Sequence, residues 1–249
     1  MLAERFNLKG RTALVTGSAR GIGRGIALAL AEYGAKVIVH GSRPSAPLDE
    51  ALSEVRKLSP DSVAVVADLS DPAAVEAMPA DVDIVVSNVA IQERMKWYEF
   101  DMAEAKREMQ VNFFATLRLF QRAYPRMKEK RWGRLIAVGS VQERRPHPDM
   151  VAYAASKGAL ENLVRNLAWQ VAGDGITVNN LCPGVFLTDR NRDALGDPAY
   201  ARRVTDAIPM HDYALPEDAA GAALLLASDA GRYITGATIM VDGGLCLPR

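Results

Sequence analysis

Seven short apolar segments recur along the chain, separated by more polar stretches. Within each segment the apolar residues follow one another without alternation, which is typical of strands buried on both faces of a sheet. We therefore expect seven such strands, near residues 12, 36, 62, 82, 133, 175 and 237.

The stretch between the first two strands, GIGRGIALALAEYG, has helical periodicity. Ile22, Ile26 and Leu30 recur at every fourth position, and Gly34 is placed to end the helix. Because strands and helices alternate, the pattern predicts an α/β fold with a doubly wound, central parallel sheet flanked by helices. Since no linker or repeat divides the chain, we expect a single Rossmann-type domain over residues 1–249.

Charge and composition narrow the class of partner. With 49% hydrophobic residues, a chain of 249 residues can bury a large core. Its 30 basic and 30 acidic residues cancel, so no net field attracts nucleic acid or an anionic membrane. A nucleic-acid binder is further disfavoured by the lack of a basic stripe with interleaved aromatic residues. The expected partner is a small molecule.

The two cysteines, Cys182 and Cys246, are far apart and lack metal-ligand spacing. This usage is typical of a reducing compartment and predicts neither a disulfide framework nor a metal site. The N-terminal residues lack the apolar core of a signal peptide, and the longest apolar run, near 219–227, is too short to span a bilayer. We expect a cytoplasmic protein that makes no membrane contact.

A glycine-rich loop, TGSARGIG at 16–23, follows the first strand and opens the first helix, as a dinucleotide-binding turn does. Gly17 permits the tight turn, Gly21 lets backbone approach a pyrophosphate, and Gly23 allows close packing of helix on strand. The alternative is a tight strand-to-helix turn that binds nothing. The predicted cofactor-binding residues of this loop are Gly17, Ser18, Arg20, Gly21, Ile22 and Gly23.

The end of the second predicted strand carries no carboxylate, although an acidic residue there would bind a ribose 2′-hydroxyl. The strand runs instead into Ser42 and Arg43. Together with Arg20, these residues provide two guanidinium groups and a hydroxyl, which suit a 2′-phosphate. We predict that NADP(H) is preferred over NAD(H); the alternative is that Arg43 is a solvated loop residue.

Asp68 and Leu69 close the third predicted strand. The Asp68 carboxylate is placed to accept a hydrogen bond from an adenine amino group, while Leu69 offers its backbone. Ser70 or Asp71 just beyond is equally able to cap a short helix. The two interpretations are compatible.

Tyr153 stands one helical turn before Lys157 in the segment YAASK. Ser140 ends the fifth predicted strand, and Asn112 lies in a predicted helix that carries MQVNFFATL. Since the carboxyl ends of parallel strands face the ligand crevice, Ser140 and the helix after it are expected beside a nicotinamide.

These residue types permit a proton transfer coupled to a hydride transfer. An ammonium one turn away is expected to lower the phenol pKa of Tyr153 from about 10, so that Tyr153 acts as general acid or base. Lys157 is also placed to hold the nicotinamide ribose. Ser140 is expected to hydrogen-bond the reacting oxygen, and Asn112 to fix a water.

The same spacing occurs in YPRMK, at Tyr124 and Lys128, and provides an internal control. Pro125 is expected to disfavour helical geometry at Tyr124. The neighbouring segment MKEKRWGR is typical of a solvated basic surface. We interpret this second pair as a surface feature without catalytic companions.

Taken together, the motifs resemble the classical short-chain dehydrogenase/reductase family over nearly the whole chain, in particular its 3-oxoacyl-acyl-carrier-protein reductases and gluconate-type sugar dehydrogenases. Ser140 stands thirteen residues before Tyr153, which is the family's usual interval. The matching segments are TGSARGIG, Asp68, Asn88, Asn112, Ser140, YAASK, PGVFLT at 183–188 and VDGG near the end.

The resemblance implies roles for these residues. Asn112, Ser140, Tyr153 and Lys157 would be the catalytic tetrad, with Tyr153 and Lys157 also touching the cofactor. The nicotinamide end would lie against Pro183, Gly184, Val185 and Thr188. The resemblance also implies a homotetramer or a homodimer.

Two departures from the family pattern stand out. The family's Asn-Asn-Ala-Gly after the fourth strand is Ser-Asn-Val-Ala here, so Asn88 is kept while Ala90 adds a methyl group close to the expected adenosine ribose. We still expect both residues to bind the cofactor. The segment between Asp68 and Val82 is also short, which should trim the helix before the fourth strand.

Substrate identity is expected to lie in three polar, arginine-rich segments: after Ser140, after Ala90, and over 188–216, which we interpret as a closing lid. Such segments favour a polar or anionic substrate over a large apolar one. Sugar acids, polyols, keto acids and 3-oxoacyl thioesters all remain open. The candidate substrate residues are Gln142, Arg144 and Arg190, against the alternative that such arginines are solvated.

The leading hypothesis is an NADP(H)-dependent enzyme that transfers a hydride to or from a carbonyl or secondary alcohol of a small polar substrate. The alternative is a catalytically silent, nucleotide-binding regulatory protein. Because a sensor has no need for all four residues of the tetrad, the sequence favours the enzyme.

Overall fold

The computed structural model describes residues 1–248, which form a seven-stranded parallel sheet in the order β3-β2-β1-β4-β5-β6-β7. All seven predicted strands are present. The order reverses between β1 and β4, and ligands bind at such switch points in doubly wound sheets. The strands are β1 Thr12–Val15, β2 Lys36–Gly41, β3 Val63–Val66, β4 Ile84–Ser87, β5 Gly133–Val138, β6 Ile176–Pro183 and β7 Thr238–Val241.

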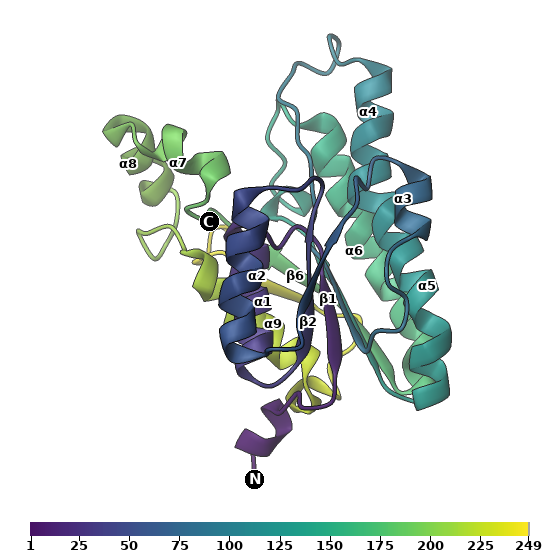
Figure 1. The fold of residues 1–249 in the computed structure, drawn as a ribbon. Coiled ribbons are helices and arrows are strands. Elements are labelled where there is room, and N and C mark those ends of the chain that lie inside the picture. Colours follow the sequence, from purple (N-terminus) through teal and green to yellow (C-terminus); the bar gives the residue numbers. More distant parts are fainter. Residues whose placement is uncertain (249) are drawn as a thin grey trace.

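Helices cover both faces of the sheet (Figure 1). One face carries α1, α2 and α9, and the other carries α3, α5 and α6. The α helices are α1 Gly21–Glu32, α2 Ala46–Leu58, α3 Pro72–Glu76, α4 Met102–Met109, α5 Ala115–Lys130, α6 Val151–Val171, α7 Asp189–Leu195, α8 Pro198–Asp206 and α9 Ala220–Ala227. The short 3₁₀ helices are η1 Ala3–Phe6, η3 Val141–Glu143, η4 Ala172–Asp174, η5 Pro216–Ala219 and η6 Asp229–Gly231, and η2 Gln110–Phe114 is a π-helical turn.

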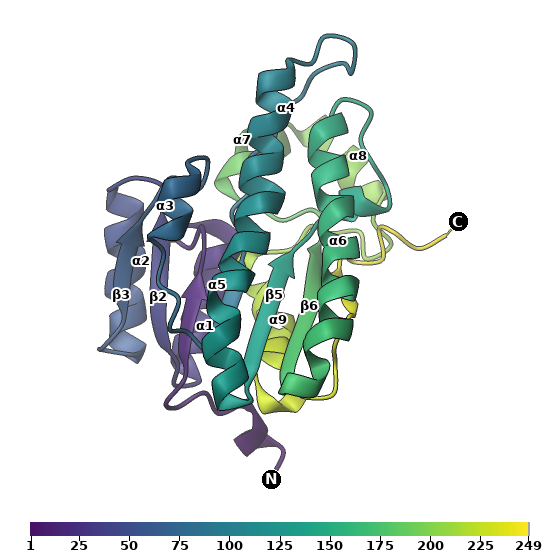
Figure 2. The same ribbon diagram turned by 90° about the vertical axis from the view of Figure 1, so that its right-hand side faces the viewer.

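The core has one apolar cluster on each side of the sheet, which explains the continuous apolar runs. Successive strand residues point to opposite faces. Val15 therefore belongs to the same cluster as Leu30 of α1, while Leu14 belongs to the same cluster as Phe120 of α5. Figure 2 shows α5 and α6 lying across β5 and β6. A strand covered by helices on both sides has no solvent-exposed face, so its sequence does not alternate between apolar and polar residues.

The edge strand β3 departs from the prediction that all seven strands are buried on both faces. Val63 and Val66 are 39% and 46% exposed. β3 pairs only with β2, at one end of the sheet, where flanking helices give less cover than at the centre. An apolar run therefore predicted the strand but not its depth.

Pro125 lies inside α5, so the expectation that it disfavours helical geometry at Tyr124 was wrong. Phe120 and Met127 on the same helix are buried in the core, and this tertiary packing outweighs the local preference of the residue before a proline. Lys128 donates to the Tyr124 hydroxyl at 3.1 Å, and its side chain is 56% exposed. The surface interpretation of the pair agrees with this exposure.

Candidate active site

A cleft of about 1190 Å³ runs along the carboxyl edge of the sheet. Its walls come from the segments that follow β1 to β6 and from α7 and α8, which stand off the sheet at that end (Figure 1). Pockets for one small molecule have volumes of about 300–1,000 Å³. The cleft is therefore large enough for a dinucleotide together with a small substrate.

The glycine loop after β1 has the backbone geometry that its glycines predicted. Gly17 and Gly21 have φ of +64° and +56°, in the left-handed region that favours glycine. A Cβ on Gly23 would overlap the carbonyl oxygen of Gly17 and approach Asn88 Nδ2 to 2.6 Å. Close packing at Gly23 thus brings α1 against the strand, and the start of α1 faces the cleft through Arg20, Gly21 and Ile22.

His40 at the end of β2 fixes this loop, a role that sequence reasoning missed. The Gly17 N–H donates to His40 Nδ1 at 3.0 Å, so Nε2 carries the proton and donates to the Ala67 carbonyl at 2.9 Å. Burial lowers the pKa of His40 and keeps the ring neutral. Ser18 is fully buried beside it and donates to the Val15 carbonyl at 2.7 Å, so it supports the loop and does not line the cleft.

Ser42, Arg43 and Arg20 line the end of the cleft beyond the glycine loop, together with Asp68 and Leu69. The Ser70 N–H donates to Asp68 at 2.9 Å, and this hydrogen bond lowers the pKa of the carboxyl group. The predicted cap of the following helix is Asp71, which accepts from the Ala73 N–H at 2.8 Å.

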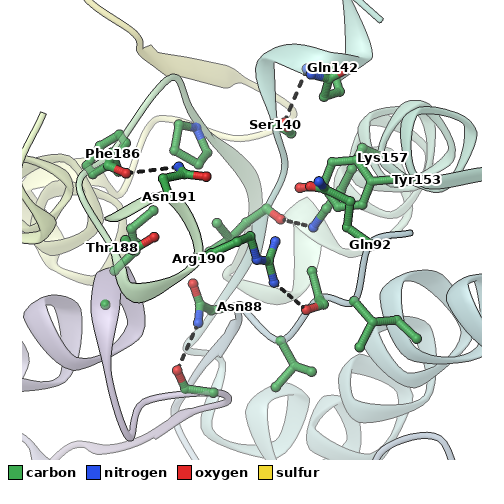
Figure 3. A pocket seen from close by; sticks show the side chains of 18 of the residues that line it. Asn88, Gln92, Ser140, Gln142, Tyr153, Lys157, Phe186, Thr188, Arg190 and Asn191 are labelled. Atoms are coloured by element: carbon green, nitrogen blue, oxygen red, sulfur yellow. Dashed lines mark hydrogen bonds between the residues drawn. The ribbon is translucent and has the colours of Figure 1, made fainter. Parts of the chain in front are cut away.

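The loop after β4 closes the floor of the cleft. Asn88 Nδ2 donates to the carbonyls of Thr16 and Gly17, at 3.0 and 3.2 Å, and so ties this loop to the glycine loop. Ala90 lines the cleft, and its carbonyl accepts from Arg190 Nη2 at 2.8 Å (Figure 3).

Ser140, Tyr153 and Lys157 meet in the same cleft (Figure 3). Ser140 follows β5, while Tyr153 and Lys157 lie in the first two turns of α6. Lys157 Nζ donates to the Val138 carbonyl at 2.7 Å and lies 5.7 Å from the centre of the Tyr153 ring. Pro183, Gly184, Val185 and Thr188 line the cleft on the side of β6.

Two of the three candidate substrate residues, Gln142 and Arg190, line the cleft. Gln142 Oε1 accepts from the His147 N–H at 2.6 Å. Arg144 does not line this cleft, because it turns to Glu161 and donates at 2.9 Å. Other polar residues from the three predicted substrate segments also line the cleft, although none of them was among the three candidates: Gln92, Arg94, Arg145, His147, Asn191 and Tyr200.

A family described as enoyl-(acyl carrier protein) reductase matches residues 17–246. The chain belongs to the short-chain dehydrogenase/reductase family. Gluconate 5-dehydrogenase of Gluconobacter oxydans is 32% identical to this short-chain dehydrogenase/reductase over 249 residues, with 97% of each chain covered.

Solved structures of the same family share the fold of this short-chain dehydrogenase/reductase. A 3-oxoacyl (acyl-carrier-protein) reductase of Agrobacterium tumefaciens with NADP bound is 37% identical, with a TM-score of 0.92 over 98% of this chain and 97% of that one. A gluconate 5-dehydrogenase of Burkholderia cenocepacia in complex with NADP and tartrate is 32% identical, with a TM-score of 0.90 and both chains fully covered. This chain therefore belongs to a family of oxidoreductases.

Asn112 of this short-chain dehydrogenase/reductase is fully buried and positions the loop after β4 from outside the cleft. It lies in the π-helical turn between α4 and α5, a feature frequent at functional sites that the sequence did not reveal. Its side chain accepts from the Ile91 N–H at 2.9 Å and donates to the Ile91 carbonyl and to Ser156 Oγ, both at 3.0 Å. Asn112 thereby joins the loop to α6, which carries the tyrosine.

Burial dominates the electrostatics of the tyrosine and the lysine. It raises the pKa of Tyr153, against the opposing effects of the Arg190 charge and a hydrogen bond with Ser140. The expectation that the pKa of Tyr153 would be lowered was therefore wrong for this structure, because burial outweighs the opposing effects. Burial also lowers the pKa of Lys157 to about 8.

Within residues 1–248, no three acidic, histidine or cysteine side chains come together in a way that would hold a metal ion. Across the same residues, none of the helices combines the length and apolar character needed to cross a bilayer.

Proposed function

We propose that this short-chain dehydrogenase/reductase transfers a hydride between NADP(H) and a carbonyl or secondary alcohol of a small polar substrate. The observation that carries the proposal is that Ser140, Tyr153 and Lys157 line one cleft together with the glycine loop. A nucleotide-binding regulator without activity has no use for these three side chains at the cofactor cleft.

The residues of the cleft fit a dinucleotide. Arg20 at the N-cap of α1 makes no side-chain cap, so the first-turn amides of α1 remain available to a phosphate. The glycines of the loop leave room for such a group beside the backbone. When bound, the nicotinamide gives or accepts the hydride.

Proton transfer falls to Tyr153, whose hydroxyl gives a proton to the carbonyl oxygen during reduction and takes it back during oxidation. Ser140 Oγ accepts from the Gln142 N–H at 3.2 Å, so its O–H, which also bonds Tyr153, is available to turn to the reacting oxygen. Lys157, with a pKa of about 8, is mainly charged at neutral pH and attracts the ribose hydroxyls and the developing phenolate.

The proposed preference for NADP(H) rests on the end of β2. Ser42 and Arg43 follow the strand in place of a carboxylate, and Arg20 lines the same end of the cleft. Guanidinium groups match the geometry and charge of a 2′-phosphate. The solved relatives from Agrobacterium tumefaciens and Burkholderia cenocepacia also hold NADP.

A polyhydroxylated or hydroxylated carboxylic acid is the substrate class that this cleft favours. Arg94, Arg145 and Arg190 line it together with Gln142, and guanidinium groups bind carboxylates in a bidentate manner. Two relatives are named as gluconate 5-dehydrogenases, and one of them holds tartrate. The segment 188–216, with α7 and α8, serves as a lid, held by the hydrogen bond from Arg190 to Ala90.

The test is a substrate screen followed by NADPH absorbance. Sugar acids, polyols, 2-keto acids and 3-oxoacyl thioesters are offered to the wild type and to Tyr153→Phe, in both directions. We expect turnover of a sugar acid or keto acid, and a loss of about 10²-fold or more in kcat for Tyr153→Phe because the proton donor is removed. NADPH titrations should give similar affinities for both proteins.

Unchanged turnover in Tyr153→Phe would overturn the assigned mechanism. NADPH binding without turnover of any compound class would favour the silent regulator.

A further inference from the structure

Glu143, in the 3₁₀ turn after β5, makes two hydrogen bonds directly behind the catalytic serine. Its Oε1 accepts from the Ser140 backbone N–H at 3.0 Å, and its Oε2 accepts from Asn180 Nδ2 at 2.9 Å. Ser140 Oγ in turn accepts from the Gln142 N–H, which completes a capping box around the turn. One carboxylate thus fixes the backbone of Ser140, joins it to β6, and leaves the serine hydroxyl facing the cleft.

The backbone around Glu143 is shaped to admit this carboxylate. A Cβ on Gly139 would overlap Glu143 Oε1, so only glycine leaves the space that Oε1 occupies. Asn180 Oδ1 is buried and has no hydrogen-bond partner among the described residues. The unpaired Asn180 oxygen lies beside the Glu143 carboxyl group and can accept a hydrogen bond. The donor can be the protonated carboxyl group of Glu143, or the amide of a glutamine that replaces Glu143.

We propose that Glu143 is a positioning residue, which holds Ser140 in its catalytic orientation and supplies the negative charge that keeps Lys157 protonated. The inference rests on the proposed function, because it assigns Glu143 to the same active site. Glu143 itself does not line the cleft.

Several charged groups surround Glu143. Lys157 stabilises its negative charge, while Glu161 opposes it. Glu143 in return raises the pKa values of Tyr153, Lys157 and Cys182. The titratable and charged groups that face this network are Tyr153, Lys157, Glu161 and Arg165 from α6, Cys182 from β6, Arg144 directly after the turn, Arg190 from α7, and Asp242 and Cys246 from the segment after β7.

Burial raises the pKa of Glu143 to about 7, despite the opposing hydrogen bonds from Ser140 and Asn180. Glu143 is therefore ionised above neutral pH, where its charge raises the pKa of Lys157. If that charge is removed, Lys157 loses its proton at lower pH. If Glu143 only filled space, its replacement would leave the titration of Lys157 unchanged.

The test compares Glu143→Gln with the wild type. The glutamine keeps the shape and an acceptor for the Ser140 N–H, and Asn180 can rotate to offer its unpaired oxygen to the new amide. We expect Glu143→Gln to bind NADPH within about twofold of the wild type, while the alkaline limb of its kcat against pH moves to lower pH by at least about half a unit.

The matched control is Glu161→Gln, which removes a neighbouring carboxylate that bonds Arg144 and Arg165 but not Ser140. Its alkaline limb should stay in place. Glu143→Ala, which removes the carboxylate that accepts from the Ser140 N–H and from Asn180 Nδ2, should lower kcat by at least about tenfold at every pH. Thermal unfolding establishes that each variant is folded.

A readout that does not need turnover is the infrared absorbance of protonated carboxyl groups in the cofactor-free protein. As pH rises through about 7, the wild type should lose the signal of the protonated Glu143 carboxyl group. Glu143→Gln should not show this signal at any pH. An unshifted alkaline limb, or the absence of this signal from the wild type, overturns the inference. If instead Tyr153→Phe retains turnover, the proposed function fails, and the infrared titration still reports on Glu143.

Discussion

The two tyrosine–lysine pairs of the chain have the same spacing on a helix but different surroundings. On α5, Lys128 is solvated and donates directly to the Tyr124 hydroxyl at 3.1 Å. On α6, Lys157 is only 2% exposed and donates to a backbone carbonyl beneath the cleft. Burial changes the pKa of a lysine far more than a solvated partner does. The Tyr124 hydroxyl and the Asp174 charge raise the pKa of Lys128 away from neutrality, whereas burial lowers the pKa of Lys157 to about 8. Of the two lysines, only Lys157 is therefore shifted toward the pH range that acid–base chemistry uses.

At the same scale, Arg43 and Arg20 are expected to decide the choice of cofactor. Arg43→Ala should weaken NADPH binding by about tenfold or more and leave NADH binding within about twofold, because a charged hydrogen bond contributes about 1.5–3 kcal/mol. Arg20→Ala should act in the same direction, less strongly, since Arg20 also contacts Asp189 at 3.5 Å. Fluorescence titration with both cofactors measures these affinities.

Arg24→Ala is the control for these two variants. Arg24 lies in the first turn of α1, directly after the glycine loop, but its guanidinium binds Glu54 at 2.6 Å. Its loss should leave both affinities unchanged. Equal loss of NADPH and NADH binding in Arg43→Ala would contradict the role of Arg43 at the 2′-phosphate.

At the scale of elements, the junction of β1 and α1 depends on a close backbone contact that only glycine permits. Because Gly23 has no side chain, α1 comes close to the carbonyl of Gly17. Asn88, in the loop after β4, donates a hydrogen bond to the same carbonyl. His40 holds the Gly17 N–H from β2. Three strands thus fix one turn, and its fixed shape presents the α1 amides to a phosphate.

Gly23→Ala is therefore expected to destabilise the protein by about 1–3 kcal/mol, the usual cost of overpacking. NADPH affinity should fall as well, because the turn must move. Gly221→Ala provides the control: Gly221 is an exposed residue of α9, where an added Cβ meets nothing within 4 Å. It should raise stability by about 0.5–1 kcal/mol, since alanine favours helix. Chemical denaturation measures both, and equal stabilities of the two variants would contradict the packing argument.

At the scale of the whole molecule, the fold brings chemistry from distant segments to one edge of the sheet. Residues after six strands reach the same cleft, and Arg190 of α7 donates to the Ala90 carbonyl across it. The homotetramer or homodimer implied by the family resemblance stays a prediction. Trp169 and Tyr233 are 91% and 93% exposed, and aromatic residues are enriched at protein interfaces.

The free energy of unfolding should depend on pH because the carboxyl group of Glu143 is buried. Its folded pKa of about 7 lies above its ordinary value of 4.5, so the folded state holds this proton more tightly than the unfolded state. The resulting stability is fully present below about pH 4.5 and is lost as pH rises through 7.

We therefore expect the free energy of unfolding of the wild type, relative to Glu143→Gln, to fall by on the order of 2–3 kcal/mol across that window. Urea denaturation at a series of pH values measures the difference. A difference that does not vary with pH would mean that Glu143 has an ordinary pKa.

The sequence by itself determined the features that depend on neighbouring residues: seven strands, the α1 helix, the turn at Gly17 and the spacing of Tyr153 and Lys157. These follow from periodicity and backbone preference, which act over a few residues. The match of several motifs at family intervals then indicated the family.

Only the tertiary structure decided the features that depend on distant contacts. In the folded chain, β3 is exposed at the edge of the sheet and Pro125 lies inside α5. Arg144 binds Glu161 and points away from the cleft. Burial also raises the pKa of Tyr153. Burial and charge proximity are set by segments that meet only in the folded chain, so no local pattern reports them.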